Sequence, residues 1–113
     1  MPERPGELEQ LILFAVLRLL GRAYGVGIRR EIEERTGRSV SPGGIYTILG
    51  RLETRGLVTS RLSEETPERG GRRKKMYRIT PDGAAALRAS WDALHAMAED
   101  VIPELRAATE AEG

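Results

Sequence analysis

The stretch SPGGIYTILGRLETRG, residues 41–56, decides the fold, and it predicts a short helix with both ends marked. Ser41 suits the N-cap because its hydroxyl can accept a bond from an amide of the first turn, and Pro42 suits the first helical position. Gly56 can adopt the left-handed conformation that commonly ends a helix. We therefore expect an exposed helix over about residues 42–55.

The two faces of this helix differ. One face is apolar at helical spacing, through Ile45, Leu49 and Leu52. The other face carries hydroxyl groups, a guanidinium group and, in the first turn, backbone amides that no side chain covers. These groups belong to Ser41, Gly43, Gly44, Tyr46, Thr47 and Arg51. Such groups bind phosphate at a helix N-terminus and read base edges in the major groove of DNA. Alone, the stretch is better explained as a capped surface helix whose tyrosine packs on a neighbour, so its surroundings must decide.

The residues before this stretch predict two more helices. Residues 8–20 are apolar on nearly every side, so this helix must be covered on several sides, most simply by a second subunit. Gly21 ends it, and residues 24–27, Tyr-Gly-Val-Gly, predict a flexible turn. Residues 28–35 predict a helix with one narrow apolar stripe and a solvated opposite face. Joined by a tight turn to the helix at residues 42–55, it is typical of a helix-turn-helix.

A hairpin is expected directly after the helix-turn-helix. Residues 57–62 and 76–79 favour strands, and the polar loop between them contains Pro67 and two glycines. This loop and its edge carry five cations: Arg69, Arg72, Arg73, Lys74 and Lys75. They predict contact with DNA phosphates or the minor groove, although a merely solvated loop would have the same composition. A helix-turn-helix followed by such a hairpin, here about residues 57–79, is a winged helix.

The C-terminal residues predict a long helix with a dimerisation seam. Thr80 and Pro81 repeat the pattern of cap and proline. The seam consists of apolar residues separated alternately by four and three positions, as in a coiled coil: Leu87, Trp91, Leu94, Ala98, Val101 and Leu105. Pro103 conflicts with the end of this seam, because proline inside a helix removes a hydrogen bond and clashes with the preceding turn. We expect the helix to end or kink near Val101, with residues 103–110 forming at most a short helical tail.

The seam and the first helix present more apolar surface than one small winged helix can cover, which predicts a symmetric homodimer. The expected interface residues are Leu11, Phe14, Leu87, Trp91, Leu94 and Ala98. The alternative is that the seam packs on the first helix of its own chain. A dimer would place two recognition helices roughly 34 Å apart, about one DNA turn, as a palindromic operator requires.

Two regions are therefore expected. Residues 1–80 would form the DNA-binding domain, which begins with a poorly ordered arm over residues 1–6. Residues 81–113 would form the dimerisation helix and a short acidic tail.

Composition excludes several kinds of site. The 113 residues include no cysteine and one histidine, so they cannot form disulfides, thiolate nucleophiles, zinc-thiolate sites or multi-histidine centres. We expect no cofactor, no metal and no catalysis. The longest apolar run, residues 11–17, is too short to span a bilayer, and the N-terminus lacks the layout of a signal peptide. A cytoplasmic protein without a membrane partner is expected.

Several motifs match a known family in both wording and order. They are SPGxIY at residues 41–46, RLExxGLV at residues 51–58, YRITPDG at residues 77–83, and the loop sequence PERGGRRK at residues 67–74. By these motifs the chain resembles the PadR family of winged-helix transcriptional regulators, in the short form with a single C-terminal dimerisation helix. The resemblance covers about residues 8–100.

The residues and the resemblance lead to the same expectation. The fold is mainly α with a small β-hairpin (α+β), a winged helix-turn-helix with an N-terminal helix and a C-terminal dimerisation helix. The resemblance implies a homodimeric repressor that releases double-stranded operator DNA when a small-molecule effector changes the dimer angle. Two alternatives remain: a protein-interaction module with an incidental basic wing, or a binder of planar hydrophobic ligands at the dimer interface. Trp91 could stack such a ligand, although it is more simply an interface core residue.

Overall fold

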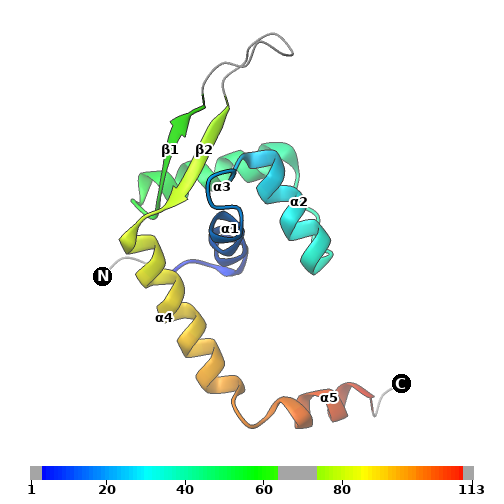
Figure 1. Ribbon diagram of the computed structural model, residues 1–113. Helices are drawn as coiled ribbons and strands as arrows, with labels where there is room; N and C mark the ends of the chain where they lie inside the picture. The colour runs from blue at the N-terminus through cyan, green and yellow to red at the C-terminus, as the bar shows by residue number, and fades with distance from the viewer. Residues whose placement is uncertain (1–3, 64–73, 111–113) are drawn as a thin grey trace.

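The computed structural model describes residues 4–63 and 74–110, and the structural statements below concern these residues. They form five helices and one two-stranded antiparallel sheet (Figure 1), in the order α1 (Glu7–Arg18), α2 (Gly25–Thr36), α3 (Pro42–Thr54), β1 (Val58–Leu62), β2 (Lys75–Ile79), α4 (Pro81–Ala98) and α5 (Ile102–Glu110). The expected fold is confirmed, since a helix-turn-helix is followed by a hairpin wing and a long helix. No helix in this part of the chain is long and apolar enough to cross a bilayer.

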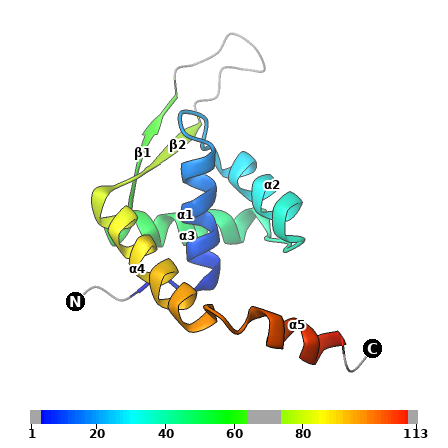
Figure 2. The ribbon, with the colours of Figure 1, turned by 60° about the horizontal axis from the view of Figure 1, so that its bottom comes forward.

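Helix α1 is the centre of the domain and is buried by its own chain. Four of its residues, spread over one broad face of the helix, are at most 3% exposed: Ile12, Leu13, Ala15 and Val16. Helix α1 packs against α2, α3, α4 and β2, and Figure 2 shows it crossing α3. Most of the cover that the sequence suggested a second subunit would supply therefore comes from the chain itself. Leu17 and Leu20 remain exposed at the end of this helix and just beyond it.

Helix α3 begins and ends as the sequence predicts. Ser41 Oγ accepts a hydrogen bond from the Gly44 amide at 3.0 Å, and Pro42 lies in the first turn. Gly56 has a φ of 74° and follows the C-cap. The predicted core stripe is confirmed, because its members are at most 1% exposed: Ile45, Leu49 and Leu52. Burying each of these side chains is worth roughly 1.5–3 kcal/mol, so this face fixes the helix and leaves the opposite face outside.

Helix α2 starts earlier than the sequence predicts. Residues 24–27 were expected to form a flexible turn, but Tyr24 is the N-cap and Gly25 is the first residue of α2. The first helical bond runs from the Ile28 amide to the carbonyl oxygen of Tyr24 at 2.9 Å. Gly25 allows α2 to begin close against α3, because a Cβ there would lie 2.6 Å from the ring of Tyr46. Tertiary packing outweighs the low helix propensity of this segment.

The hairpin is fixed to the helix-turn-helix at its base. Strands β1 and β2 pair in antiparallel register from Val58 opposite Ile79 to Leu62 opposite Lys75. The Tyr77 amide donates to the carbonyl oxygen of Ala23 at 2.9 Å, which joins β2 to the segment before α2. The two strands of the wing therefore have a defined position relative to the helix-turn-helix.

Helix α4 begins against the junction of α3 and β1. Thr80 Oγ1 donates to the carbonyl oxygen of Gly56 at 2.6 Å and accepts from the amide of Gly83 at 2.9 Å. Gly83 packs so closely on Leu57 that the carbonyl oxygen of Leu57 leaves no room for a Cβ. The start of α4 is therefore fixed to the DNA-binding unit by both polar and steric contacts.

The C-terminal helix is interrupted between α4 and α5, as Pro103 predicts. Helix α4 ends at Ala98, Asp100 has a φ of 68°, and Pro103 lies in the first turn of α5, where a proline is tolerated. The predicted seam is therefore not continuous, because Val101 and Leu105 lie beyond the break. Figures 1 and 2 show α4 leading away from the body of the domain and α5 turned away from its axis.

The residues before α1 pack on the domain. The sequence predicts a poorly ordered arm over residues 1–6, but Pro5 is buried and its carbonyl oxygen accepts a bond from Gln10 Nε2 at 2.9 Å. Residues 4–6 are therefore held against α1. Residues 1–3 lie outside the described part of the chain.

Candidate nucleic-acid interface

The outer face of α3 carries the residues predicted to meet DNA. Tyr46, Thr47 and Arg51 are exposed on the side opposite the buried stripe. Thr47 Oγ1 donates to the carbonyl oxygen of Gly43 at 3.1 Å, so this hydroxyl is oriented by the helix and its oxygen can still accept a bond. The face is small and polar with one projecting cation, which suits a helix that enters the major groove.

Tyr46 is both a packing residue and a surface residue. Its ring lies over Gly25 at the start of α2, where a Cβ would come within 2.6 Å of three ring and hydroxyl atoms. The side chain is nevertheless 49% exposed. The neighbour packing that the sequence left as an alternative is therefore present, and it fixes the tyrosine without hiding it.

The first turn of α3 agrees only in part with the predicted phosphate site. The Gly44 amide is bonded to Ser41 Oγ, and a Cβ on Gly44 would lie 2.8 Å from that oxygen. The glycine is thus explained by the cap, and the prediction that its amide is left bare is wrong. Gly43 is exposed, and a Cβ there would meet no atom within 4 Å.

Gly50 is a further candidate for contact with DNA, and it lies between the family motifs at residues 41–46 and 51–58. It lies in the middle of α3, is exposed, and a Cβ on it would meet no atom within 4 Å. Glycine inside a helix costs roughly 0.5–1 kcal/mol relative to alanine, and nothing in the described chain requires it. The signal that could have found it is a glycine on the polar face of a predicted helix.

The described part of the wing is cationic. Lys74 and Lys75 are exposed where β2 begins, and Arg61 and Arg78 are exposed on the two strands. Beyond the paired strands, the Ser63 amide donates to the carbonyl oxygen of Lys74 at 2.7 Å. The other predicted wing cations lie outside the described residues: Arg69, Arg72 and Arg73.

A polar network behind α3 joins it to the hairpin. Ser60 Oγ donates to Glu53 Oε2 at 2.6 Å. Tyr77 is buried, and this burial raises the pKa of its phenol above the usual value, with the neighbouring Glu53 and Tyr46 adding to the shift. Tyr77 is therefore a neutral residue of the core. The hydrogen bond between Ser60 and Glu53 therefore joins the recognition helix to β1.

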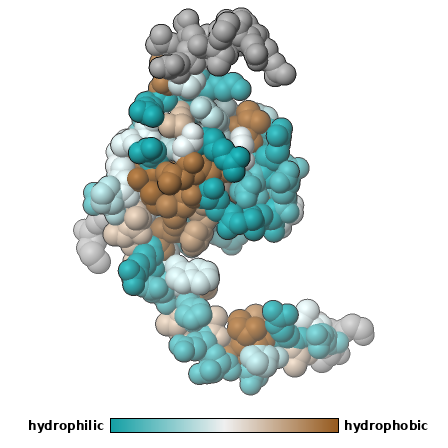
Figure 3. All heavy atoms as spheres, viewed as in Figure 1, coloured by the Kyte–Doolittle hydropathy of each residue, from teal (hydrophilic) through white to brown (hydrophobic). Residues whose placement is uncertain are grey.

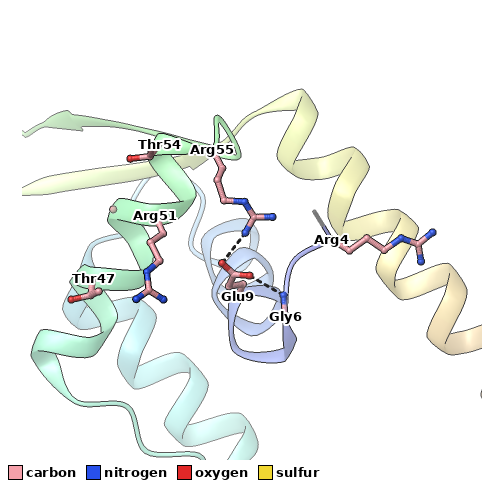
Figure 4. A pocket seen from close by; sticks show the side chains of 8 residues that line it. Arg4, Gly6, Glu9, Thr47, Arg51, Thr54 and Arg55 are labelled. Carbon is pink, nitrogen blue, oxygen red and sulfur yellow. Dashed lines mark hydrogen bonds and ion pairs between the residues drawn. The ribbon is translucent and has the colours of Figure 1, made fainter. Parts of the chain in front are cut away.

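A hollow of about 820 Å³ lies between the outer face of α3 and the start of α1 (Figure 4). We call it the arginine hollow, and its lining residues are Arg4, Gly6, Glu9, Thr47, Gly50, Arg51, Thr54 and Arg55. The described lining residues carry three guanidinium groups and one carboxylate, which is an excess of positive charge. Arg4, Glu9 and Arg55 are absent from the predicted site because only the packing of α1 beside α3 brings them together.

Part of the predicted dimer interface is exposed. Figure 3 shows an apolar patch over the region where α1 ends and another on α5. The large exposed apolar residues of α1, α4, α5 and their connections are Leu17, Leu20, Trp91, Leu94, Met97, Val101, Ile102 and Leu105. A single chain leaves this surface uncovered.

The predicted interface residues do not all belong to this surface. Trp91 and Leu94 are 51% and 63% exposed, whereas Leu87 is 3% exposed and belongs to the core of its own chain. The first half of α4 packs on α1, so the seam is open only from Trp91 onward. The remaining predicted members are half-buried: Leu11, Phe14 and Ala98.

Trp91 lies beside a second, apolar hollow of about 270 Å³, which we call the Trp91 hollow. Its lining residues are Phe14, Leu17, Ala84, Leu87, Arg88 and Trp91. The ring of Phe14 meets Trp91 edge-on at a centroid distance of 6.2 Å, and His95 stacks on Trp91 at 5.7 Å. This arrangement suits an aromatic interface and also suits a planar apolar ligand.

Comparisons with known proteins agree on one family. The model of the Transcriptional regulator PadR-like family matches residues 13–89. The transcriptional regulator Rv3488 of Mycobacterium tuberculosis is 39% identical over 79 residues, which span 70% of this chain and 69% of that protein.

Solved structures resemble this fold. A PadR family transcription regulator from Clostridium difficile has a TM-score of 0.69 and 26% identity, covering 88% of this chain and 99% of that one. Bacillus subtilis PadR, whose structure was solved in complex with operator DNA, has a TM-score of 0.64 and 27% identity, covering 74% of this chain and 46% of that one.

Proposed function

Because the chain belongs to the PadR-like family of transcriptional regulators, we propose that it is a homodimeric repressor of a palindromic operator. The outer face of α3 enters the major groove, and the wing contacts phosphates or the minor groove beside it. The similarity to Bacillus subtilis PadR, solved with operator DNA, supports DNA as the partner. The protein acts in the cytoplasm, without catalysis or a cofactor.

One observation carries this proposal: the exposed polar face of α3 stands beside a cationic hairpin that is fixed to the same core. Arg51 presents a forked donor that suits guanine O6 and N7. The hydroxyls of Tyr46 and Thr47 suit phosphates or base edges, and the exposed Gly43 permits close approach at the helix start. The wing cations neutralise phosphates: Arg69, Arg72, Arg73, Lys74 and Lys75.

The second copy of the chain is the proposed cover for the open half of α4 and for α5. Their exposed apolar residues, including Leu94 and Leu105, need such a partner because large apolar patches are unusual on monomers. A two-fold axis through this interface repeats α3, so that two recognition helices meet two operator half-sites about one turn apart.

The Trp91 hollow is the proposed site for an effector. Phe14 of α1 and Trp91 of α4 both line it. A planar apolar molecule bound between them would change how α4 leaves the domain and hence the angle between the two subunits. Release of operator DNA would follow from that change.

Binding to the DNA upstream of its own gene tests the proposal. Wild-type protein should bind this DNA more tightly than random DNA of equal length. Arg51→Ala should lower upstream affinity by about 1–3 kcal/mol and affect random DNA much less, because base contacts carry the preference. Arg18→Ala, which removes an exposed cation from the end of α1, is the matched control and should bind as wild type. Equal wild-type affinity for both DNAs would contradict the proposal.

A further inference from the structure

The arginine hollow opens on the same face of α3 that we expect to enter DNA. Thr47, Gly50, Arg51 and Thr54 form its α3 wall, whereas the opposite wall is the start of α1. Figure 4 shows Arg51 extending into the space and Arg55 directed toward Glu9, while Arg4 points away from both. The hollow is therefore continuous with the recognition surface but is built on two helices.

Arg55 is held in place by α1. Its Nη1 atom lies 2.9 Å from Glu9 Oε2, and the two side chains are only 27% and 21% exposed. The other carboxylate oxygen of Glu9 accepts the Gly6 amide at 2.8 Å. Glu9 is thus fixed by the first turn of α1 and in turn fixes the direction of the Arg55 guanidinium.

The charges of the hollow favour an anion. Arg51 lies on α3 and Arg55 is its C-cap, four residues further on, so their side chains are neighbours. Like charges at this spacing destabilise a helix by about 0.2–0.5 kcal/mol. Among the described residues that line the hollow, three are arginines and Glu9 is the carboxylate. A guanidinium can hold a carboxylate and a phosphate oxygen together, because its donors form a planar fork.

We propose that Arg55, positioned by Glu9, contacts a backbone phosphate of the bound DNA at this hollow. This inference rests on the proposed function, since it requires α3 to lie in the major groove. It adds α1 to the DNA-binding surface and gives Arg55 a different role from Arg51. Arg51 supplies preference for the operator, whereas Arg55 supplies affinity for any duplex.

The salt dependence of binding separates these roles. Each phosphate contact contributes about 0.9 to the slope of log affinity against log salt concentration. Arg55→Gln should weaken binding to upstream and random DNA by the same factor and reduce the slope by about one for each subunit bound. Arg18→Gln, at another cation paired with a carboxylate but at the far end of α1, should leave the slope unchanged. An unchanged slope for Arg55→Gln would overturn the inference.

A double variant separates the loss of a phosphate contact from the indirect effects of removing Arg55. Arg55→Gln alone leaves Glu9 without this cation, which could lower stability or repel DNA. Arg55→Gln combined with Glu9→Gln removes both charges, and thermal melting checks that it is folded. The inference predicts that the slope remains reduced in the double variant. Recovery of the wild-type slope would show that Arg55 only neutralises Glu9, and would refute the phosphate contact.

The alternative occupant of the arginine hollow is a free phosphate ion rather than a phosphate of DNA. Wild type and the double variant are melted in sodium phosphate and in sodium chloride at equal ionic strength. We expect phosphate to shift both melting temperatures equally. Stabilisation by phosphate in wild type alone, with an unchanged DNA slope, would assign the hollow to a free anion instead. The slope on random DNA tests Arg55 even if no operator preference is found, so the two proposals can fail separately.

Discussion

Gly50 lies in the middle of α3, where alanine would form a more stable helix. A Cβ at this position would meet no atom of the described chain within 4 Å. We predict that Gly50→Ala raises the free energy of unfolding by about 0.5–1 kcal/mol. It should weaken operator binding by roughly tenfold, about 1.4 kcal/mol, because the new methyl group stands between the helix and the groove.

Thermal melting and DNA titration of the same preparation check this prediction. The rise in melting temperature is its own control, since it shows that weaker binding does not come from unfolding. Gly50→Ala protein that is more stable and binds operator DNA as well as wild type would exclude Gly50 from the interface.

Single residues also show where local sequence reasoning succeeds and fails. The cap at Ser41 follows from residue type and position, and the structure confirms its bond to the Gly44 amide. That same bond removes the bare amide expected at Gly44. The pairing of Glu9 with Arg55 in the arginine hollow could not be predicted, because the two residues are 46 positions apart and no local spacing links them.

Helices and strands whose ends are marked by residues within the same segment are predicted well from the sequence. Helix α3, the two strands and the start of α4 have caps, prolines or strand-forming runs within their own sequence. Pro103 also places the break before α5 correctly, since its effect depends only on the helix that contains it. The hydrophobic period then identifies the buried face of α3.

Elements that depend on their neighbours are predicted less well. The start of α2 contains two glycines and predicts a turn, but Gly25 is the first residue of the helix and packs against the ring of Tyr46. Leu87 fits the spacing of the seam, yet α4 lies so close to α1 that this residue is buried within one chain. Which face of a helix meets its own domain and which meets a partner depends on contacts that periodicity does not encode.

For the whole molecule, the exposed half of α4 predicts a dimer. Leu94→Asp should convert the protein to a monomer on size-exclusion chromatography, because a charge in an apolar interface is costly to desolvate. The melting profile of the monomer should show a folded chain, since Leu94 is 63% exposed within one subunit.

Ala96→Asp is the matched control for this variant. Ala96 is exposed and lies two residues further along α4, on nearly the opposite side of the helix. The Ala96→Asp protein should remain dimeric. A dimer that survives Leu94→Asp would show that the subunits associate through a different surface.

A footprint on the DNA upstream of its own gene is the decisive measurement for a dimeric repressor. We predict two protected segments, centred roughly 10 base pairs apart and related by two-fold symmetry, because the dimer presents two copies of α3 about one turn apart. Arg51→Ala and Leu94→Asp should each remove this protection at the wild-type protein concentration. Absence of protection, or a single unsymmetrical protected segment with wild-type protein, would contradict a dimeric repressor on a palindromic operator.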